Sequence, residues 1–389
     1  MTQEQFKSAL RILKRTLDRV DSMDKKGNGG SNDGSVDLNT IDSGAGSADA
    51  GKAPVGAGAK PTHGFSSVAP NFKVFFDLNL VNRPGVTGQE FAFTNYHSFL
   101  FFEILPNPDM QFSFDIPFSK FYELDYQLTP KLQVRAGKIW IPFDDMAPHN
   151  IFGGRVSVSR LAPSSSQAFL PDVWADYGVG FKYQFMDTKA LSVLGHAYIV
   201  NGFGGAGSDP AGGPSYPQFT DVQGPSDNNR DKALGMRVHA VIAGKLGLGL
   251  SYYTQRWNSD SELVAKKFTL FGIDGQLRLG AIEFRAGLAS GQAEIPVDVN
   301  RNTSFRRGGL YGEVGYKFGK EQVWKLLGRG GTIQLDDRAI SVTDQTIIGG
   351  TILRRFGTLE VSFEHSRDIK SNPAKINTSY TNLRLVVAL

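Results

Sequence analysis

Asp144, Asp145 and His149 are the residues whose types and spacing most directly suggest chemistry. They stand in the stretch AGKIWIPFDDMAPHNIFGGR, which covers residues 136–155. Two carboxylates and an imidazole so close in sequence could bind a divalent metal, or serve as an acid and a base in hydrolysis. Alternatively, the three side chains hydrogen-bond to the surrounding protein and set its local charge. Which interpretation holds depends on the elements that position the stretch.

The composition excludes several kinds of site. The chain has 389 residues, 45 glycines, 28 phenylalanines and no cysteine. Without cysteine there are no disulfides and no thiolate metal sites, which fits an oxidising, extracytoplasmic compartment. The formal charge of +4 is too small to indicate a nucleic-acid partner. We expect no cofactor: the glycine-rich stretch 202–213 lacks the lysine and helix of a phosphate-binding loop, and reads more simply as an external loop.

The N-terminal part of the chain differs from the rest. Residues 1–24 predict an amphipathic helix whose apolar residues recur at steps of four and three, the spacing of a coiled coil. A helix of fewer than three heptads is seldom stable alone, so it either docks on its own protein or self-associates as a periplasmic coiled coil. Residues 25–69 are rich in Gly, Ser, Asp and Ala and predict a flexible linker. The residues of the expected oligomerisation helix are Phe6, Leu10, Leu13, Leu17 and Val20.

Residues 70–389 alternate between apolar and polar side chains. NFKVFFDLNL (71–80), MQFSFDI (110–116) and FYELDYQL (121–128) show the period of two that predicts β-strands. We expect about sixteen strands, with fourteen or eighteen as alternatives, and most are long enough to cross a bilayer at a tilt.

The connections between these strands are of two kinds, in alternation. Short turns on one side and long loops on the other are typical of a transmembrane β-barrel, with apolar side chains facing lipid and charged ones facing a polar lumen. A soluble sandwich or a propeller fits less well, because so many long strands make a poor sandwich and no blade-like repeat is present. The short turns are predicted near 106–109, 129–131, 186–189, 244–247, 278–281, 318–321 and 355–358, and the loops near 83–94, 117–120, 140–173, 201–229, 257–265, 292–304, 335–343 and 367–377.

The fold class is therefore all-β, an antiparallel transmembrane barrel with an N-terminal helix on a linker. No apolar run is long enough for a transmembrane helix, and residues 1–30 are too polar for a signal peptide. We expect the mature form of a protein of the outer membrane of a Gram-negative bacterium.

Two segments carry a family resemblance. KLQVRAGKIWIPF (131–143) resembles the strand-to-loop signature of the phosphate-selective porin O/P-like family, and VWADYGVGFKYQF (173–185) is similar to the strand after that family's constriction loop. The resemblance implies a sixteen-stranded trimeric barrel. The third long loop, 140–173, would then fold inward and narrow the channel. The residues expected at this constriction are Asp144, Asp145, His149, Arg155 and Arg160.

The charges at the predicted lumen have both signs, which departs from the lysines and arginines of phosphate-selective members. Rings of a single sign give strong ion selection, so the mixture predicts a fairly unselective pore, without phosphate specificity. The principal lumen-wall candidates are Glu123, Asp125, Arg135, Arg237, Arg285 and Arg307, and further ones are Glu103, Asp115, Asp176, Lys182, Asp274, Glu283, Glu313 and Arg384.

Three functions follow from this organisation. The first is a passive homotrimeric porin for small hydrophilic solutes and ions, in contact with membrane lipids and lipopolysaccharide. Arginines 306–307 and 354–355 could bind lipopolysaccharide phosphates or lie at barrel rims. The second is an anchor that links the outer membrane to the cell wall or to a periplasmic partner through its helix. The third, a barrel enzyme, would need Asp145 or His149, which we expect instead to line the pore without metal or catalysis.

Overall fold

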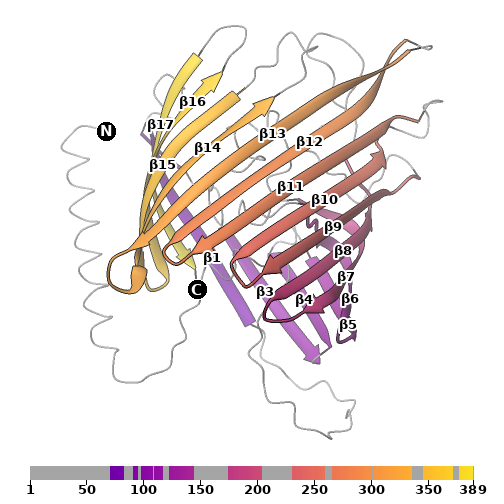
Figure 1. The fold of residues 1–389 in the computed structure, drawn as a ribbon, viewed down its shortest axis with the longest axis horizontal. Helices are drawn as coiled ribbons and strands as arrows, with labels where there is room; N and C mark the ends of the chain where they lie inside the picture. Colours follow the sequence, from indigo (N-terminus) through magenta and orange to yellow (C-terminus); the bar gives the residue numbers. More distant parts are fainter. Residues whose placement is uncertain are drawn as a thin grey trace, which may run out of the picture.

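The computed structural model describes residues 71–82, 91–94, 98–107, 109–116, 122–143, 174–203, 230–258, 265–298, 301–334, 345–370 and 376–388. Seventeen β-strands form one antiparallel sheet over these residues (Figure 1). The predicted helix and linker, residues 1–24 and 25–69, lie outside the described residues. Among the residues described, no helix is long and apolar enough to cross a membrane.

The strands follow the predicted order along the chain. The first eight are β1 (Asn71–Asn82), β2 (Ala92–Thr94), β3 (Ser98–Asn107), β4 (Met110–Ile116), β5 (Tyr122–Thr129), β6 (Leu132–Trp140), β7 (Ala175–Asp187) and β8 (Leu191–Val200). The others are β9 (Ala233–Ile242), β10 (Leu246–Arg256), β11 (Lys267–Leu279), β12 (Ile282–Asp298), β13 (Arg301–Phe318), β14 (Trp324–Gln334), β15 (Gln345–Phe356), β16 (Leu359–Lys370) and β17 (Ile376–Ala388), with a 3-10 turn, η3 (Lys320–Gln322), before β14.

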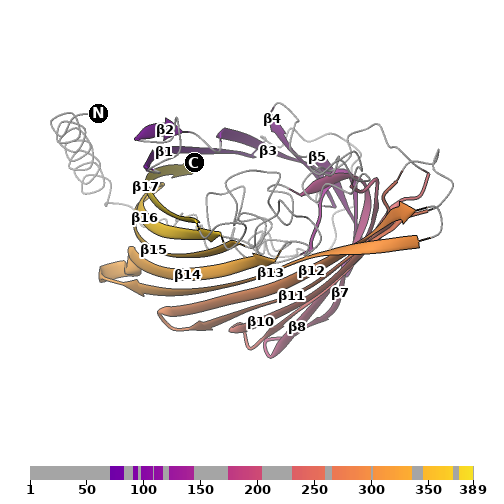
Figure 2. The same ribbon diagram turned by 90° about the horizontal axis from the view of Figure 1, so that it is seen from above.

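The pairing of β1 joins the two ends of the sheet. From β3 onward each strand pairs with the next, while β1 pairs with β17 through Phe75–Asn82 and with β3 through Asn71–Phe76. Setting aside the three-residue β2, which adds to β1, the pairings pass through sixteen strands and return to β1. Seen from above, the strands surround an interior (Figure 2).

The seven predicted short turns are confirmed, and three predicted loops are wrong in part. Of the expected loop 367–377, residues 367–370 belong to β16 and residues 376–377 to β17. Residues 92–94 form β2 on the edge of β1, with Leu80 opposite Phe93. The expected loop 292–304 is mostly strand, because β12 and β13 continue as a hairpin as far as the pair Asp298 and Arg301. This hairpin reaches beyond its neighbours (Figure 1). The alternation of Ala293, Ile295 and Val297 with polar residues or proline continues the strand pattern in this stretch. The ladder follows that pattern through Pro296, where the predicted loop had interrupted it.

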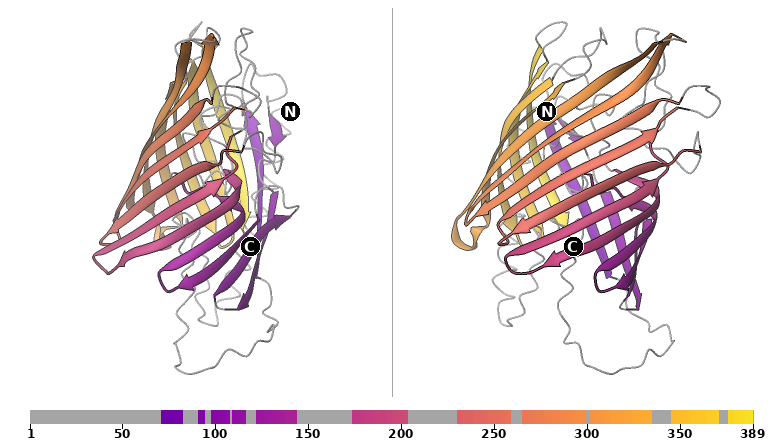
Figure 3. Two further views of the ribbon diagram at one scale, coloured as in Figure 1. Left: turned by 90° about the vertical axis from the view of Figure 1, so that its right-hand side faces the viewer. Right: turned by 45° about the vertical axis from the view of Figure 1, so that its right-hand side comes forward.

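The two faces of the sheet have opposite polarity. On β10, Leu248 and Leu250 point outward and are about half exposed. Ser251, which has the opposite parity, is buried on the inner face. β5 shows the same alternation, with Leu124, Tyr126 and Leu128 exposed and Glu123 and Asp125 buried on the other face. Figure 3 shows the strands inclined in one continuous wall. An apolar outer face and a charged inner face reverse the arrangement of a soluble protein, as the sequence predicts.

Candidate functional site

The inner face carries charges of opposite sign that pair across neighbouring strands. Arg135 on β6 binds Glu123 through Nη2 at 2.8 and 2.5 Å, and its Nε lies 3.3 Å from Asp125. The pair also holds the end of β6, since Arg135 donates to the Trp140 carbonyl and Glu123 accepts from the Trp140 N–H. Register explains the cluster, because Asp125 lies directly opposite Arg135.

A second ion pair crosses a whole strand. Arg237 on β9 donates to Asp274 on β11 through Nη1 at 2.5 Å and Nη2 at 2.8 Å, and both side chains are buried. The strand between them, β10, presents Gly249 at this level. A Cβ there would lie 2.3 Å from Arg237 Nη2 and 2.5 Å from Asp274 Oδ2. The bidentate pair therefore requires glycine at position 249.

This requirement gives a stability test. We expect Gly249→Ala to destabilise the folded protein by about 1–3 kcal/mol, because the methyl group forces the ion pair apart. The control is Gly275→Ala on β11, where the nearest atom to a new Cβ would be Leu248 Cδ2 at 3.4 Å. Urea unfolding of the reconstituted protein measures both variants. Equal effects at the two positions would contradict the steric argument.

Further pairs continue around the wall. Glu283 on β12 accepts from Lys325 on β14 at 2.6 Å and lies 2.9 Å from Lys317 on β13. Arg329 pairs with Glu364, which joins β14 to β16, and Arg355 lies 3.9 Å from Glu360. Among the described residues, acids and bases thus alternate around the inner face, without a ring of one sign.

The structure places the principal lumen-wall candidates together on this inner face, with one gap. Arg285 on β12 is buried there, and so are Glu123, Asp125 and Arg237. The Arg135 side chain is nearly buried, with 13% of its surface exposed. Arg307 lies on β13 with its backbone opposite Gly291, and its side chain lies outside the description. The residues predicted at the constriction and in the oligomerisation helix lie outside the described residues: Asp144, Asp145, His149, Arg155 and Arg160, and Phe6, Leu10, Leu13, Leu17 and Val20. Where the structure describes the chain, no three His, Asp or Glu residues gather as metal ligands.

An aromatic cluster on the inner face was not predicted. Trp174 contacts Phe143, Phe203 and Tyr253, with ring centroids 5.3, 5.1 and 5.3 Å apart, and Phe268 packs against the last two. All five rings are buried. The expectation that apolar side chains face only outward is therefore wrong at this level of β10 and β11. The available signal was register, since Tyr253 has the same parity as the inward Ser251.

The ends of two long connections lie inside the sheet at this cluster. After β6, Ile141 and Phe143 are buried, and the Ile141 N–H donates to the Trp174 carbonyl at 3.0 Å. After β8, Gly202 and Phe203 are buried against β10. The interpretation of 202–213 as wholly external is therefore wrong for its first two residues, and the others lie outside the described residues.

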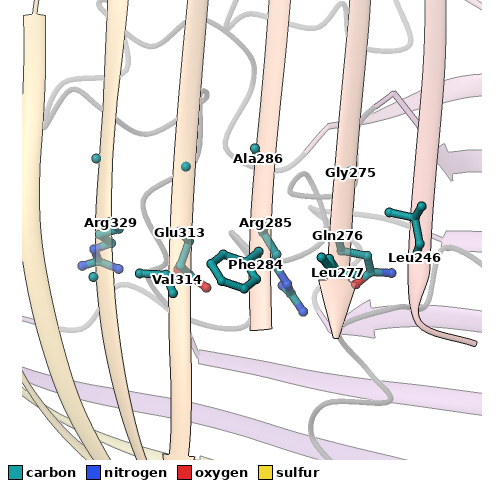
Figure 4. A pocket seen from close by; sticks show the side chains of 13 residues that line it. Leu246, Gly275, Gln276, Leu277, Phe284, Arg285, Ala286, Glu313, Val314 and Arg329 are labelled. Carbon is teal, nitrogen blue, oxygen red and sulfur yellow. The ribbon is translucent and has the colours of Figure 1, made fainter. Parts of the chain in front are cut away.

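A cavity of about 540 Å³ lies elsewhere, against β10–β14. Its floor is an in-register row of small residues, Gly275, Ala286, Gly312 and Gly330. These alternate with the buried inward residues Gln276, Arg285, Glu313 and Arg329, so the row faces outward. Figure 4 labels Gly275 and Ala286 of the row, the four inward residues, and the flanking Leu246, Leu277, Phe284 and Val314. The cavity is a groove in the apolar outer surface and does not belong to the charged inner face.

The arginine pairs take separate positions. Arg306 is exposed on β13. Arg354 lies over the rings of Trp324 and Phe356, at 5.1 and 4.3 Å, beside the short turn that follows β15, and Arg355 pairs inward with Glu360. Residues 354–355 therefore lie at the short-turn rim.

A single wall of tilted antiparallel strands, apolar outside and lined with paired charges inside, defines the fold class of the outer-membrane porins. The chain matches an anion-selective porin from Comamonas acidovorans with a TM-score of 0.59 and 9% identity, over 82% of this chain and 99% of that one. It matches the outer membrane channel DcaP of Acinetobacter baumannii with a TM-score of 0.57 and 10% identity, over 82% and 97%. It also matches OmpT, an outer membrane protein of Vibrio cholerae, with a TM-score of 0.53 and 14% identity, over 82% and 99%. Neither a family model nor a sequence relative among curated proteins matches the chain.

Proposed function

We propose that the chain is an outer-membrane porin of a Gram-negative bacterium, in which small hydrophilic solutes and ions diffuse passively through a closed, water-filled barrel. The observation that carries this proposal is the polarity of the wall, apolar outside and charged inside, on a porin fold. The pairing of β1 with both β17 and β3 supports closure. Inward charges that alternate in sign support weak ion selection.

The finer features of the proposal rest on the sequence. The segment 140–173 narrows the pore, and Asp144, Asp145, His149, Arg155 and Arg160 line the narrow part. This is supported by the buried positions of Phe143 and Trp174 at the two ends of the segment. The barrel is a homotrimer in contact with lipids and lipopolysaccharide, as in the phosphate-selective porin O/P-like family that it resembles. The helix of residues 1–24 forms a periplasmic coiled coil.

The orientation of the wall can be tested at one position. We expect Leu250→Arg, near the middle of β10 on the outer face, to cost about 2–4 kcal/mol of folding stability in lipid vesicles, because it places a charge in hydrocarbon. The control is Thr358→Arg in an exposed turn, which we expect to change stability by less than about 0.5 kcal/mol. Folding titrations in urea measure both. A tolerated Leu250→Arg would show that this face does not meet lipid.

The function is tested by planar-bilayer recording of the purified protein. We expect stepwise conductance increments and, in a salt gradient, a reversal potential close to zero because the inner charges have both signs. Absence of any conductance would contradict the porin proposal and favour a membrane anchor. A reversal potential near the limit for one ion would contradict weak selection.

A further inference from the structure

We propose that Arg237 and Gln255 are positioning residues of this pore. They hold the starts of two long connections, at Phe143 and Phe203, against the inner wall and thereby set the pore's width. This inference rests on the proposed function. The role differs from the one predicted from the sequence. A charged lumen-wall residue would interact with permeating ions, whereas Arg237 would hold the chain in place.

Arg237 has a buried guanidinium whose Nη1 lies within hydrogen-bond distance of three acceptors. Besides its two bonds to Asp274, Nη1 donates to the Phe143 carbonyl at 3.1 Å and to Ser251 Oγ at 2.9 Å. Ser251 Oγ itself donates to the Phe143 carbonyl. With 3% of its surface exposed, Arg237 presents little charge to solution. A planar fork fixed by a carboxylate is suited to hold a backbone carbonyl in one place, which a lysine ammonium cannot reproduce.

The Phe143 ring is fixed as well as its carbonyl. It lies over Gly272 on β11, where an added Cβ would be 2.9 Å from the ring. The chain that follows β6 is thus attached to β9, β10 and β11 at once, through Arg237, Ser251 and Gly272. These strands belong to the barrel wall, so the attachment transfers the wall's rigidity to the start of the segment.

Gln255 does the same for the second connection. Its Oε1 accepts from the Phe203 N–H at 2.7 Å and its Nε2 donates to the Phe203 carbonyl at 2.9 Å. The side-chain amide therefore satisfies both backbone groups of one residue, as a neighbouring strand would. Tyr253 donates to the same Oε1 at 2.5 Å, and Asp176 accepts from the Gly202 N–H at 2.7 Å. Gln255 is 4% exposed.

The two attachments share one aromatic contact. Trp174 lies against Phe143 on one side and Phe203 on the other, and against Tyr253 on the wall. If either Phe143 or Phe203 is released from the wall, Trp174 loses one of its ring contacts. The remaining phenylalanine then packs against a less constrained Trp174. We expect the effects of the two attachments on pore width to be coupled rather than independent.

The test uses substitutions that keep charge or volume. Arg237→Lys preserves the charge but not the fork, and Gln255→Met preserves the length but not the hydrogen bonds. We expect each to raise single-channel conductance by at least about 1.5-fold, and the double variant to raise it by less than the product. The control is Arg354→Lys, an arginine that lies over the rings of Trp324 and Phe356 at the short-turn rim, which we expect to leave conductance unchanged.

Hydrogen exchange supplies a readout independent of conductance. In Arg237→Lys, amides of residues 141–143 should exchange faster than in the wild-type protein, whereas those of β14 should not change. If both conductance and exchange of Arg237→Lys equal the wild type, the positioning role is overturned. If the wild type itself does not conduct, the porin proposal fails, while the exchange result still decides whether Arg237 holds Phe143.

Assembly is monitored by heat-modifiable mobility in gels. Should Arg237→Lys fail to assemble, Gln255→Met decides alone. Gln255 holds Phe203 through hydrogen bonds that do not involve Arg237. If an assembled Gln255→Met protein conducts like the wild type, the proposal is overturned for both residues, because their effects on pore width are coupled.

Discussion

Replacing Asp274 with alanine is expected to cost the folded protein about 3–5 kcal/mol, the usual loss when one member of a buried ion pair is removed. The carboxylate accepts two hydrogen bonds from Arg237, and both side chains are less than 5% exposed. Alanine removes these bonds and leaves a buried guanidinium with fewer acceptors. The measurement is the free energy of unfolding in urea for the protein reconstituted in vesicles.

The matched comparison removes the pair as a whole. We expect Arg237→Met combined with Asp274→Leu to come within about 1 kcal/mol of the wild type, because an apolar pair of similar volume avoids burying any charge. The same double variant should still conduct more than the wild type, since it lacks the fork that holds Phe143. The double variant would then show that the ion pair's effect on stability is distinct from its effect on pore width. A double variant as unstable as Asp274→Ala would contradict the account of the single substitution.

Replacing residues 144–155 with a short Gly-Ser linker is expected to raise single-channel conductance by about two-fold or more, because the narrowest section sets the resistance of a pore. The deletion removes Asp144, Asp145, His149 and Arg155 from the proposed constriction. It leaves Phe143 and Trp174, so the start and end of the segment stay attached to the inner wall. Planar-bilayer recording of the purified variant measures the change.

The control replaces residues 335–344, between β14 and β15, with the same linker. We expect its conductance to match the wild type. If the 144–155 variant also matches the wild type, the constriction lies elsewhere. If both deletions widen the pore equally, loop length matters and the residues of 140–173 have no special role.

The sequence alone was sufficient for the strand order and the short turns. Alternation such as that of Leu124, Asp125 and Tyr126 is a local property, and a strand with one lipid-facing side has no other way to arrange its side chains. The turn at Gly280, with φ of 60°, is local too, because glycine adopts that conformation without strain. At 292–304 the alternation of Ala293, Ile295 and Val297 was present, but Pro296 and the polar residues that follow favoured a loop, and the prediction failed.

The partners on the inner face were decided only by the tertiary structure. Arg237 lies 37 residues from Asp274 and 94 from Phe143, and their contact depends on the register of β9, β10 and β11 together. A shift of one residue in either pairing would turn the side chains to the other face. Alternation shows which side chains point inward, but it contains no information on which of them meet. Their meeting required the sheet to curve until Trp174, Phe143 and Phe203 came together inside it.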